Sequence, residues 1–128
     1  VFYLYICVDR NILQSNLGGD AELTEKSLKA LTQAALTVAP SGKQNSFASR
    51  AYASYALAEK GNKQPRTLVT SYIDPIPNGD MVGKAIDKLQ AMKDKMDRAY
   101  GPCADTEYVL DVHNSRGTMN ELIQFISE

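Results

Sequence analysis

One short stretch of the chain concentrates side chains that can bind phosphate groups. Lysine and arginine attract phosphates, and hydroxyl and amide groups donate hydrogen bonds to phosphate and sugar oxygens. From residue 41 to residue 66 the chain has five basic residues and one acidic residue, Glu59, although its overall formal charge is −1. A loop of this composition after the first helix could contact the phosphates and sugars of a nucleic acid; the alternative is an ordinary solvated loop. The candidate residues are Ser41, Gly42, Lys43, Gln44, Asn45, Ser46 and, in support, Arg50.

Motifs for catalysis are weak by comparison. His113 is the only histidine, and on a strand it would share a face with Asp111, which could orient an imidazole or help to hold a metal. Two candidate ligands fall short of a closed metal site, and no nucleophile elbow is present. Gly42-Lys43 is not a P-loop, because Thr37 and Gln44 stand where that motif needs Gly and Ser or Thr. We expect no catalytic residue, no metal and no cofactor, and a protein that is not an enzyme.

Length and composition exclude several classes of protein. The 128 residues, 44% apolar and 23% charged, are typical of one globular domain, residues 1–128. A near-zero net charge excludes global attraction to nucleic acid or membranes, and no apolar run is long enough to cross a bilayer, so we expect no membrane partner. The two cysteines, Cys7 and Cys103, are too few for a disulfide scaffold and indicate reduced thiols in the cytoplasm.

The hydrophobic pattern predicts the element order β-α-β-β-α-β-α. The fold class is α+β: a ferredoxin-like or RRM-like partial domain, with a mainly antiparallel sheet and helices packed on one face. Asp80 is expected to cap the long helix, and Thr118-x-x-Glu121 is a capping-box match that opens the last helix. The predicted strands are residues 1–8, 50–58, 67–73 and 107–113, with a hairpin loop at 61–65, and the predicted helices are about 21–38, about 80–100 and the segment after 118.

The faces of these elements give further expectations. Alternate residues of the first strand, Tyr3 and Tyr5, could stack bases or pack in the core. The mixed charges of the helix at 80–100 predict a solvent face with ion pairs rather than a binding stripe. Apolar stripes at helical spacing predict buried Leu28, Leu31, Ala34, Ala35 and Val38 in the first helix, and Val82, Ala85, Ile86, Leu89, Met92, Met96 and Ala99 in the second.

The first part of the chain resembles a known family. Its pattern is Val1-Phe2-Tyr3-x-Tyr5, then Asn11, Leu13-Gln14 and Asn16-Leu17-Gly18-Gly19, followed after a helix by Pro40-x-x-Lys43-Gln44. In these residues, and more weakly in Thr118-x-x-Glu121-Leu122, the chain resembles the CasC backbone subunits of Cascade, the type I-E CRISPR surveillance complex.

This resemblance implies an RRM-like palm with finger and thumb insertions, of which the chain would be the C-terminal part. Copies of such a subunit stack head to tail along the spacer of a crRNA and grip its backbone without reading sequence. A separate helicase-nuclease cuts the target. The implied partners are crRNA, sister copies, other Cascade subunits and, through the assembled complex, target DNA. Lys43 is the strongest single candidate for an RNA contact, because a cation facing a phosphate needs no base identity.

Two other functions remain open from the sequence. A ferredoxin-like protein-interaction or small-ligand-sensing module would bind no nucleic acid, and an enzyme would need a pocket around Asp111 and His113. If half of a palm is missing, we also expect an exposed strand edge or an uncovered apolar face.

Overall fold

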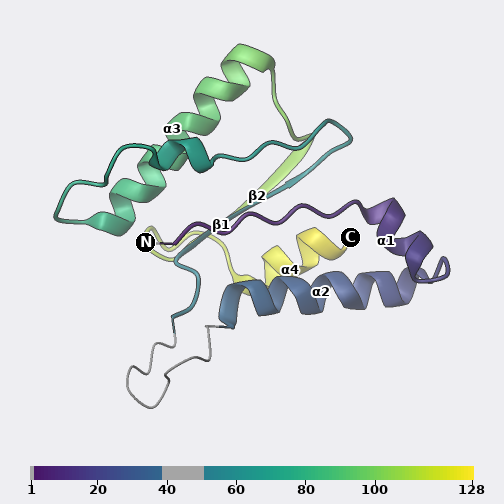
Figure 1. Cartoon of the computed structure of the whole chain (residues 1–128). Coiled ribbons are helices and arrows are strands. Elements are labelled where there is room, and N and C mark those ends of the chain that lie inside the picture. The colour runs from purple at the N-terminus through teal and green to yellow at the C-terminus, as the bar shows by residue number, and fades with distance from the viewer. Residues whose placement is uncertain (1, 39–50) are drawn as a thin grey trace. The chain divides into compact units, whose positions relative to one another are not determined.

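The computed structural model describes residues 2–38 and 51–128 and shows an α+β fold (Figure 1). Its strands are antiparallel, because Val112 N donates to Ser54 O (3.0 Å) at one end and Asp105 N donates to Lys60 O (2.8 Å) at the other. The predicted class is therefore confirmed, with two strands in the described sheet. The elements are α1 (Arg10–Asn16), α2 (Ala21–Thr37), β1 (Tyr55–Lys60), the 3-10 helix η1 (Val69–Tyr72), α3 (Met81–Tyr100), β2 (Thr106–Asp111) and α4 (Met119–Ser127).

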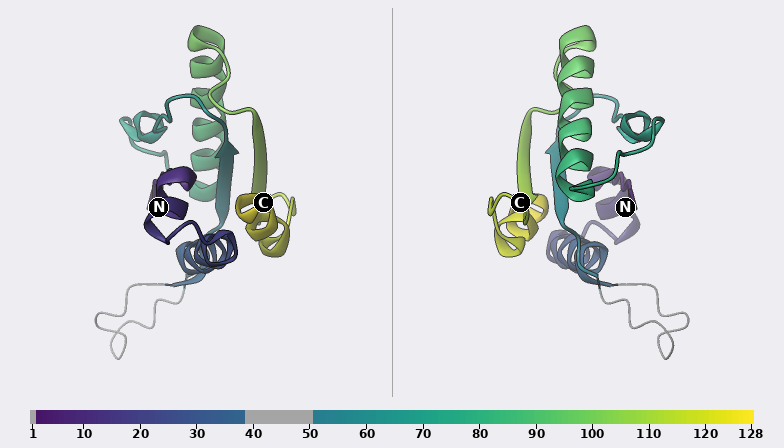
Figure 2. Two further views of the ribbon diagram at one scale, coloured as in Figure 1. Left: turned by 90° about the vertical axis from the view of Figure 1, so that its right-hand side faces the viewer. Right: turned by 90° about the vertical axis from the view of Figure 1, so that its left-hand side faces the viewer.

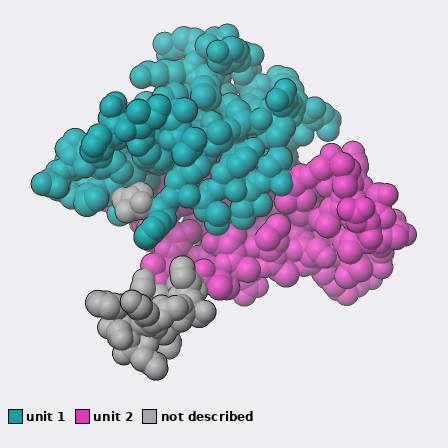
Figure 3. All heavy atoms as spheres, viewed as in Figure 1, with its two compact units in different colours: residues 1–7, 59–107 teal, residues 8–58, 108–128 magenta. Residues whose placement is uncertain are grey.

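The described residues divide into two compact units (Figure 3). Unit 1 contains residues 2–7 and 59–107, and unit 2 contains residues 8–38, 51–58 and 108–128. Each strand contributes residues to both units, since the unit boundaries fall within β1 and β2.

Unit 2 is built around three leucines from three elements. Leu36 of α2, Leu110 of β2 and Leu122 of α4 are at most 9% exposed and form one cluster. Helices α2 and α4 pack against each other, as Figure 2 shows from two further sides. Small alanines of the β1 region, Ala53 and Ala56, allow close packing against this cluster. Burial of apolar surface therefore holds the two helices to the strands.

Unit 1 is built around α3 and η1. Leu68, Ala85, Ile86 and Leu89 are buried there, and the Tyr72 hydroxyl donates to Ala85 O (3.0 Å). Of the stripe predicted for α3, Met92 and Met96 are half-buried and Ala99 is exposed.

Tyr3 belongs to the packing of unit 1. Its hydroxyl accepts from Leu68 N (3.1 Å) and lies 3.3 Å from Thr67 Oγ1, and its ring centroid lies 5.8 Å from that of Tyr72. These contacts favour the packing alternative over base stacking for Tyr3.

The first predicted strand does not form. Residues 2–8 are outside any strand, and their backbone groups make no ladder bond to another described residue. Their alternate side chains are uncovered: Phe2, Leu4, Ile6 and Val8 are 103%, 67%, 46% and 36% exposed. A strand needs a neighbour to pair with, which the hydrophobic pattern alone does not supply. The exposed apolar side chains of this segment lie outside the described sheet, so they do not test the expectation of an uncovered face or edge of the sheet.

Helix α1 was not expected from the pattern. The Asp9 side chain caps it by accepting from Ile12 N (3.0 Å), and Arg10 donates to Ser127 O (3.1 Å) at the end of α4. Aspartate just before a helix is a common cap, so Asp9 was the signal to follow.

The strand predicted at 67–73, and with it the hairpin, is wrong. Residues 69–72 form η1, and β1 pairs with β2 instead. Local side-chain bonds favour the tight turn, because Thr67 Oγ1 accepts from Val69 N (3.2 Å) and Ser71 Oγ donates to Leu68 O (2.6 Å). Strand β1 begins at Tyr55, later than the predicted residue 50, which lies outside the described residues.

The buried stripe of α2 also differs from the prediction. Leu28 is buried as expected, but Leu31 and Val38 are 42% and 72% exposed, and the stripe continues through Thr24, Thr32 and Leu36. Threonine can be buried there because its hydroxyl bonds within the helix, as Thr32 Oγ1 does to Leu28 O (2.8 Å).

Candidate nucleic-acid interface

The predicted RNA-binding residues Ser41, Gly42, Lys43, Gln44, Asn45, Ser46 and Arg50 lie outside the described residues. The structure does describe the two flanks of this stretch, both in unit 2. Helix α2 ends at Thr37, where Val38 N donates to Ala34 O (2.9 Å). On the other side, Ala53 N donates to Leu36 O (2.8 Å), and Leu36 is part of the core. The two described flanks are therefore joined to each other at Leu36 and Ala53.

After this stretch, Arg66 does not add a free positive charge, because its guanidinium is already paired with carboxylates. Its guanidinium lies 2.9 Å from Glu59 Oε2 and 2.6 Å from Asp97 Oδ1, and its side chain is only 16% exposed. Burial alone would lower the pKa of Arg66, but the hydrogen bond and charge of Glu59, with the charge of Asp97, raise it. Arg66 thus joins β1 to α3 and is not available to a phosphate.

Lys93 extends this ion-pair network within unit 1. Its ammonium lies 2.8 Å from Glu107 Oε2 of β2 and 3.1 Å from Asp97 Oδ2. The hydrogen bond to Glu107, chiefly, raises the pKa of Lys93 although burial opposes it. Burial would raise the pKa of Asp97, but hydrogen bonds and charge from Lys93 and Arg66 hold it below its usual value. These charges hold β1, α3 and β2 together.

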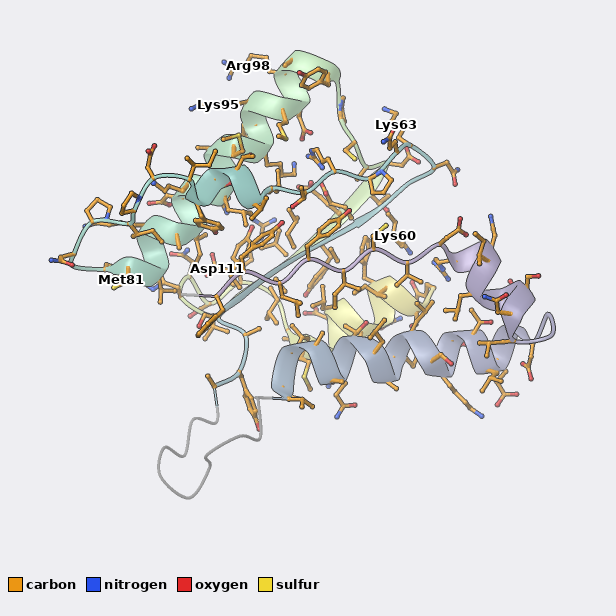
Figure 4. All side chains as sticks on the ribbon, in the orientation of Figure 1. Lys60, Lys63, Met81, Lys95, Arg98 and Asp111 are labelled. Atoms are coloured by element: carbon orange, nitrogen blue, oxygen red, sulfur yellow. The ribbon has the colours of Figure 1, made fainter. Side chains whose placement is uncertain are left out.

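Four other cations of α3 are not in this network. Lys84 donates to Asn78 O (2.7 Å) and Lys88 to Asp74 O (2.9 Å), whereas Lys95 and Arg98 are exposed and project outward from the helix (Figure 4). Among the described residues, none of the four forms an ion pair. The expectation of an ion-paired solvent face on α3 is therefore wrong for these cations. We name Lys84, Lys88, Lys95 and Arg98 the α3 cation row.

Asp111 and His113 do not share a strand face. Strand β2 ends at Asp111, and His113 lies exposed in the turn that follows. Asp111 is 3% exposed and accepts from Asn114 N (3.0 Å) and Asn114 Nδ2 (2.7 Å). Burial would raise the pKa of Asp111, but these hydrogen bonds lower it. Its carboxylate thus organises the turn that Asp111 and Arg116 close by exchanging backbone hydrogen bonds.

Other kinds of site receive little support from the part of the chain that the structure describes. No three potential metal ligands gather among those residues, and no helix there is long and apolar enough to span a membrane. Both cysteines are free thiols, and Cys103 Sγ donates to Gln64 O (3.3 Å).

A shallow groove in unit 2 has a volume of about 380 Å³. It lies on α2 and α4 and is lined mainly by polar side chains, among them Glu25, Lys29, Gln124 and Glu128. Glu25 and Lys29 pair with each other, and Gln124 donates to Glu128, so these groups already have partners.

Comparison with known proteins places this fold in a family. The model of the CT1975-like proteins matches residues 1–125, nearly the whole chain. The chain belongs to the CT1975-like family. This family is one of CRISPR-associated (Cas) proteins, so the CRISPR association expected from the resemblance is confirmed. No curated protein matches the chain.

Proposed function

We propose that this CT1975-like protein is a crRNA-binding backbone subunit of a type I-E Cascade complex, which grips the guide by its phosphates and polymerises along the spacer. The observation that carries the proposal is the match to a Cas family over residues 1–125. The CasC-like pattern around Lys43-Gln44 supports the finer assignment.

The proposed contact is sequence-independent. Lys43 faces a phosphate, and the amides of Gln44 and Asn45 and the hydroxyls of Ser41 and Ser46 donate to phosphate or sugar oxygens. Phosphates are alike at every nucleotide, so a guide of any sequence is held in the same way. The hydrogen bond between Ala53 N and Leu36 O supports this role, because it ties the flanks of the stretch to the core of unit 2.

The proposed partners beyond crRNA are sister copies, other Cascade subunits and, in the assembled complex, target DNA. The uncovered side chains of residues 2–8 supply apolar surface of the kind that assembly buries. We further propose that the chain binds without catalysing, in the cytoplasm, where guide and invading DNA meet. The use of Asp111 as a turn acceptor supports the first point.

Titration of single-stranded RNA against the full-length protein, by filter binding, tests the role of Lys43. K43A should weaken binding about three- to tenfold at low salt and reduce the salt dependence by roughly one phosphate contact. The matched control is K26A, which removes an exposed lysine of α2 that pairs with Glu22. Equal binding by K43A, K26A and the unmodified protein would contradict the proposed contact.

A protein-interaction module without nucleic acid is the second candidate, favoured by the uncovered apolar side chains of residues 2–8. It predicts a defined dimer. The ratio of absorbance at nucleic-acid and protein wavelengths distinguishes the two, because a crRNA-binding subunit retains RNA through purification and an interaction module does not.

A further inference from the structure

We infer that the α3 cation row is a second contact surface for a nucleic-acid phosphate backbone, separate from the stretch around Lys43. The inference rests on the proposed function, since it adds a surface to a nucleic-acid-binding protein. It comes from four observations on α3: the spacing of the cations, the absence of ion pairs to them among the described residues, the side chains that lie beside them, and the hydrogen bonds that hold Lys84 and Lys88.

The spacing places the four cations on one face. Lys84, Lys88, Lys95 and Arg98 stand at i, i+4, i+11 and i+14, which at about 100° per residue keeps them within about 40° of one line. At about 1.5 Å per residue the row extends for about 21 Å along the helix. Ala85, Ile86 and Leu89 on the other side are buried, so the row faces away from the core of unit 1.

The cations of this row are not neutralised by ion pairs. Lys93 and Asp97 of α3 are already paired in the network with Arg66, whereas the row forms no ion pair within the described residues. Two carboxylates, Asp87 and Asp94, are exposed on the flank of the row. These two carboxylates weaken the positive electrostatic potential of the row near the middle of the helix. The strongest attraction for an anion therefore lies at Lys95 and Arg98.

The neighbours of the row favour a phosphate backbone over a membrane. A membrane-binding helix needs large apolar side chains beside its cations. Between Lys88 and Lys95 this face carries only Ala91, which is small, although Met81 is 44% exposed beside Lys84 at the start of the helix. A linear set of cations with one large apolar neighbour at its end suits an extended polyanion, whose charges repeat along a line.

Hydrogen bonds to the backbone hold the first two cations of the row in place. Lys84 and Lys88 are half-buried, and each donates to a backbone carbonyl of the proline-rich connector at 74–79. An ammonium has three N–H donors, so each keeps donors for a phosphate oxygen. Arg98 adds five N–H donors in a planar fork suited to phosphate.

A double substitution in the full-length protein tests the inference. K95Q/R98Q removes two exposed charges, and the matched control K26Q/K29Q removes two exposed charges of α2 that are already paired with Glu22 and Glu25. Each protein is titrated against single-stranded RNA and duplex DNA over a range of salt. K95Q/R98Q should lose about three- to tenfold in affinity at low salt and lower the salt slope by roughly one or more. The control should change less than about twofold. A loss with RNA assigns the row to the guide, and a loss with duplex DNA assigns it to the target.

Two results overturn the inference, and they are distinguishable. If K95Q/R98Q binds both ligands as the control does while K43A weakens RNA binding, the row is not a contact and the proposed function stands. If the unmodified protein binds neither ligand, the proposed function fails and the inference fails with it. Equal melting temperatures of the two double variants show that a loss is not due to unfolding.

Discussion

At the scale of single residues, the buried carboxylate of Asp111 has a structural role. Asp111 and His113 are spaced like partners on a strand, but β2 ends at Asp111 and its carboxylate accepts two hydrogen bonds from Asn114. The sequence could not reveal this, because the end of a strand depends on its partner. Arg66 shows the same limit, since its partners Glu59 and Asp97 are 7 and 31 residues away.

Asp111 should make stability depend on pH. Its pKa is lowered in the folded state, so its contribution is complete above the unfolded pKa of about 3.9 and is lost as pH falls through the lower folded value. D111N, which cannot accept a second bond from Asn114 Nδ2, should cost about 1–3 kcal/mol in the free energy of unfolding at pH 7. Urea unfolding followed by circular dichroism at pH 7 and pH 3 measures the difference. A cost that is the same at both pH values would contradict this role.

The Arg66 network should contribute more to stability than a surface ion pair. R66Q removes the partner of two carboxylates that are each about 21% exposed, and should cost about 1–3 kcal/mol. K26A breaks a pair whose side chains are 68% and 77% exposed, and should cost no more than about 0.5 kcal/mol. Thermal unfolding of both variants in the same buffer makes the comparison. The network is not stabilising if the two costs are equal.

At the scale of elements, helices were predicted better than strands. The caps of α3 and α4 are local: Asp80 accepts from Gly83 N (2.9 Å), and Thr118 Oγ1 accepts from Glu121 N (3.2 Å) as the capping-box pattern predicts. Strand pairing is not local. Residues 2–8 and 67–73 have strand-like composition, yet only β1 and β2 find each other in the described sheet.

The cap of α4 can be tested separately from its packing. T118A removes the hydroxyl that accepts from Glu121 N and should destabilise the protein by about 1 kcal/mol, whereas T118S keeps the hydroxyl and should cost much less. Urea midpoints of the two variants give the comparison. Equal loss in both would mean that the methyl group, rather than the hydrogen bond, matters at this position.

At the scale of the whole molecule, the charged residues have different roles although the net charge is near zero. Arg66 and Lys93 stabilise unit 1, while Lys95 and Arg98 of the α3 cation row are exposed. The apolar side chains of residues 2–8 are uncovered in the same chain. Among the described residues, exposed cations of the α3 cation row and exposed apolar side chains of residues 2–8 are the surfaces that the proposed assembly around a nucleic acid would use.

The apolar segment should drive self-association of the 128-residue chain. Light scattering should show association that grows with protein concentration, because Leu4 and Ile6 expose 67% and 46% of their surface beside unpaired backbone groups. L4K/I6K should reduce it by placing charges on that face. A monomer at every concentration, with or without the substitutions, would contradict the expectation.

The most direct test of the central claim is the salt dependence of RNA binding by the full-length protein, measured for two single-stranded RNAs of equal length and unrelated sequence. A subunit that grips phosphates should bind both with similar affinity, and the logarithm of the binding constant should fall linearly with the logarithm of salt concentration, by about 0.7 per phosphate contact. Affinity that differs strongly between the two RNAs, or that does not change with salt, would contradict backbone gripping.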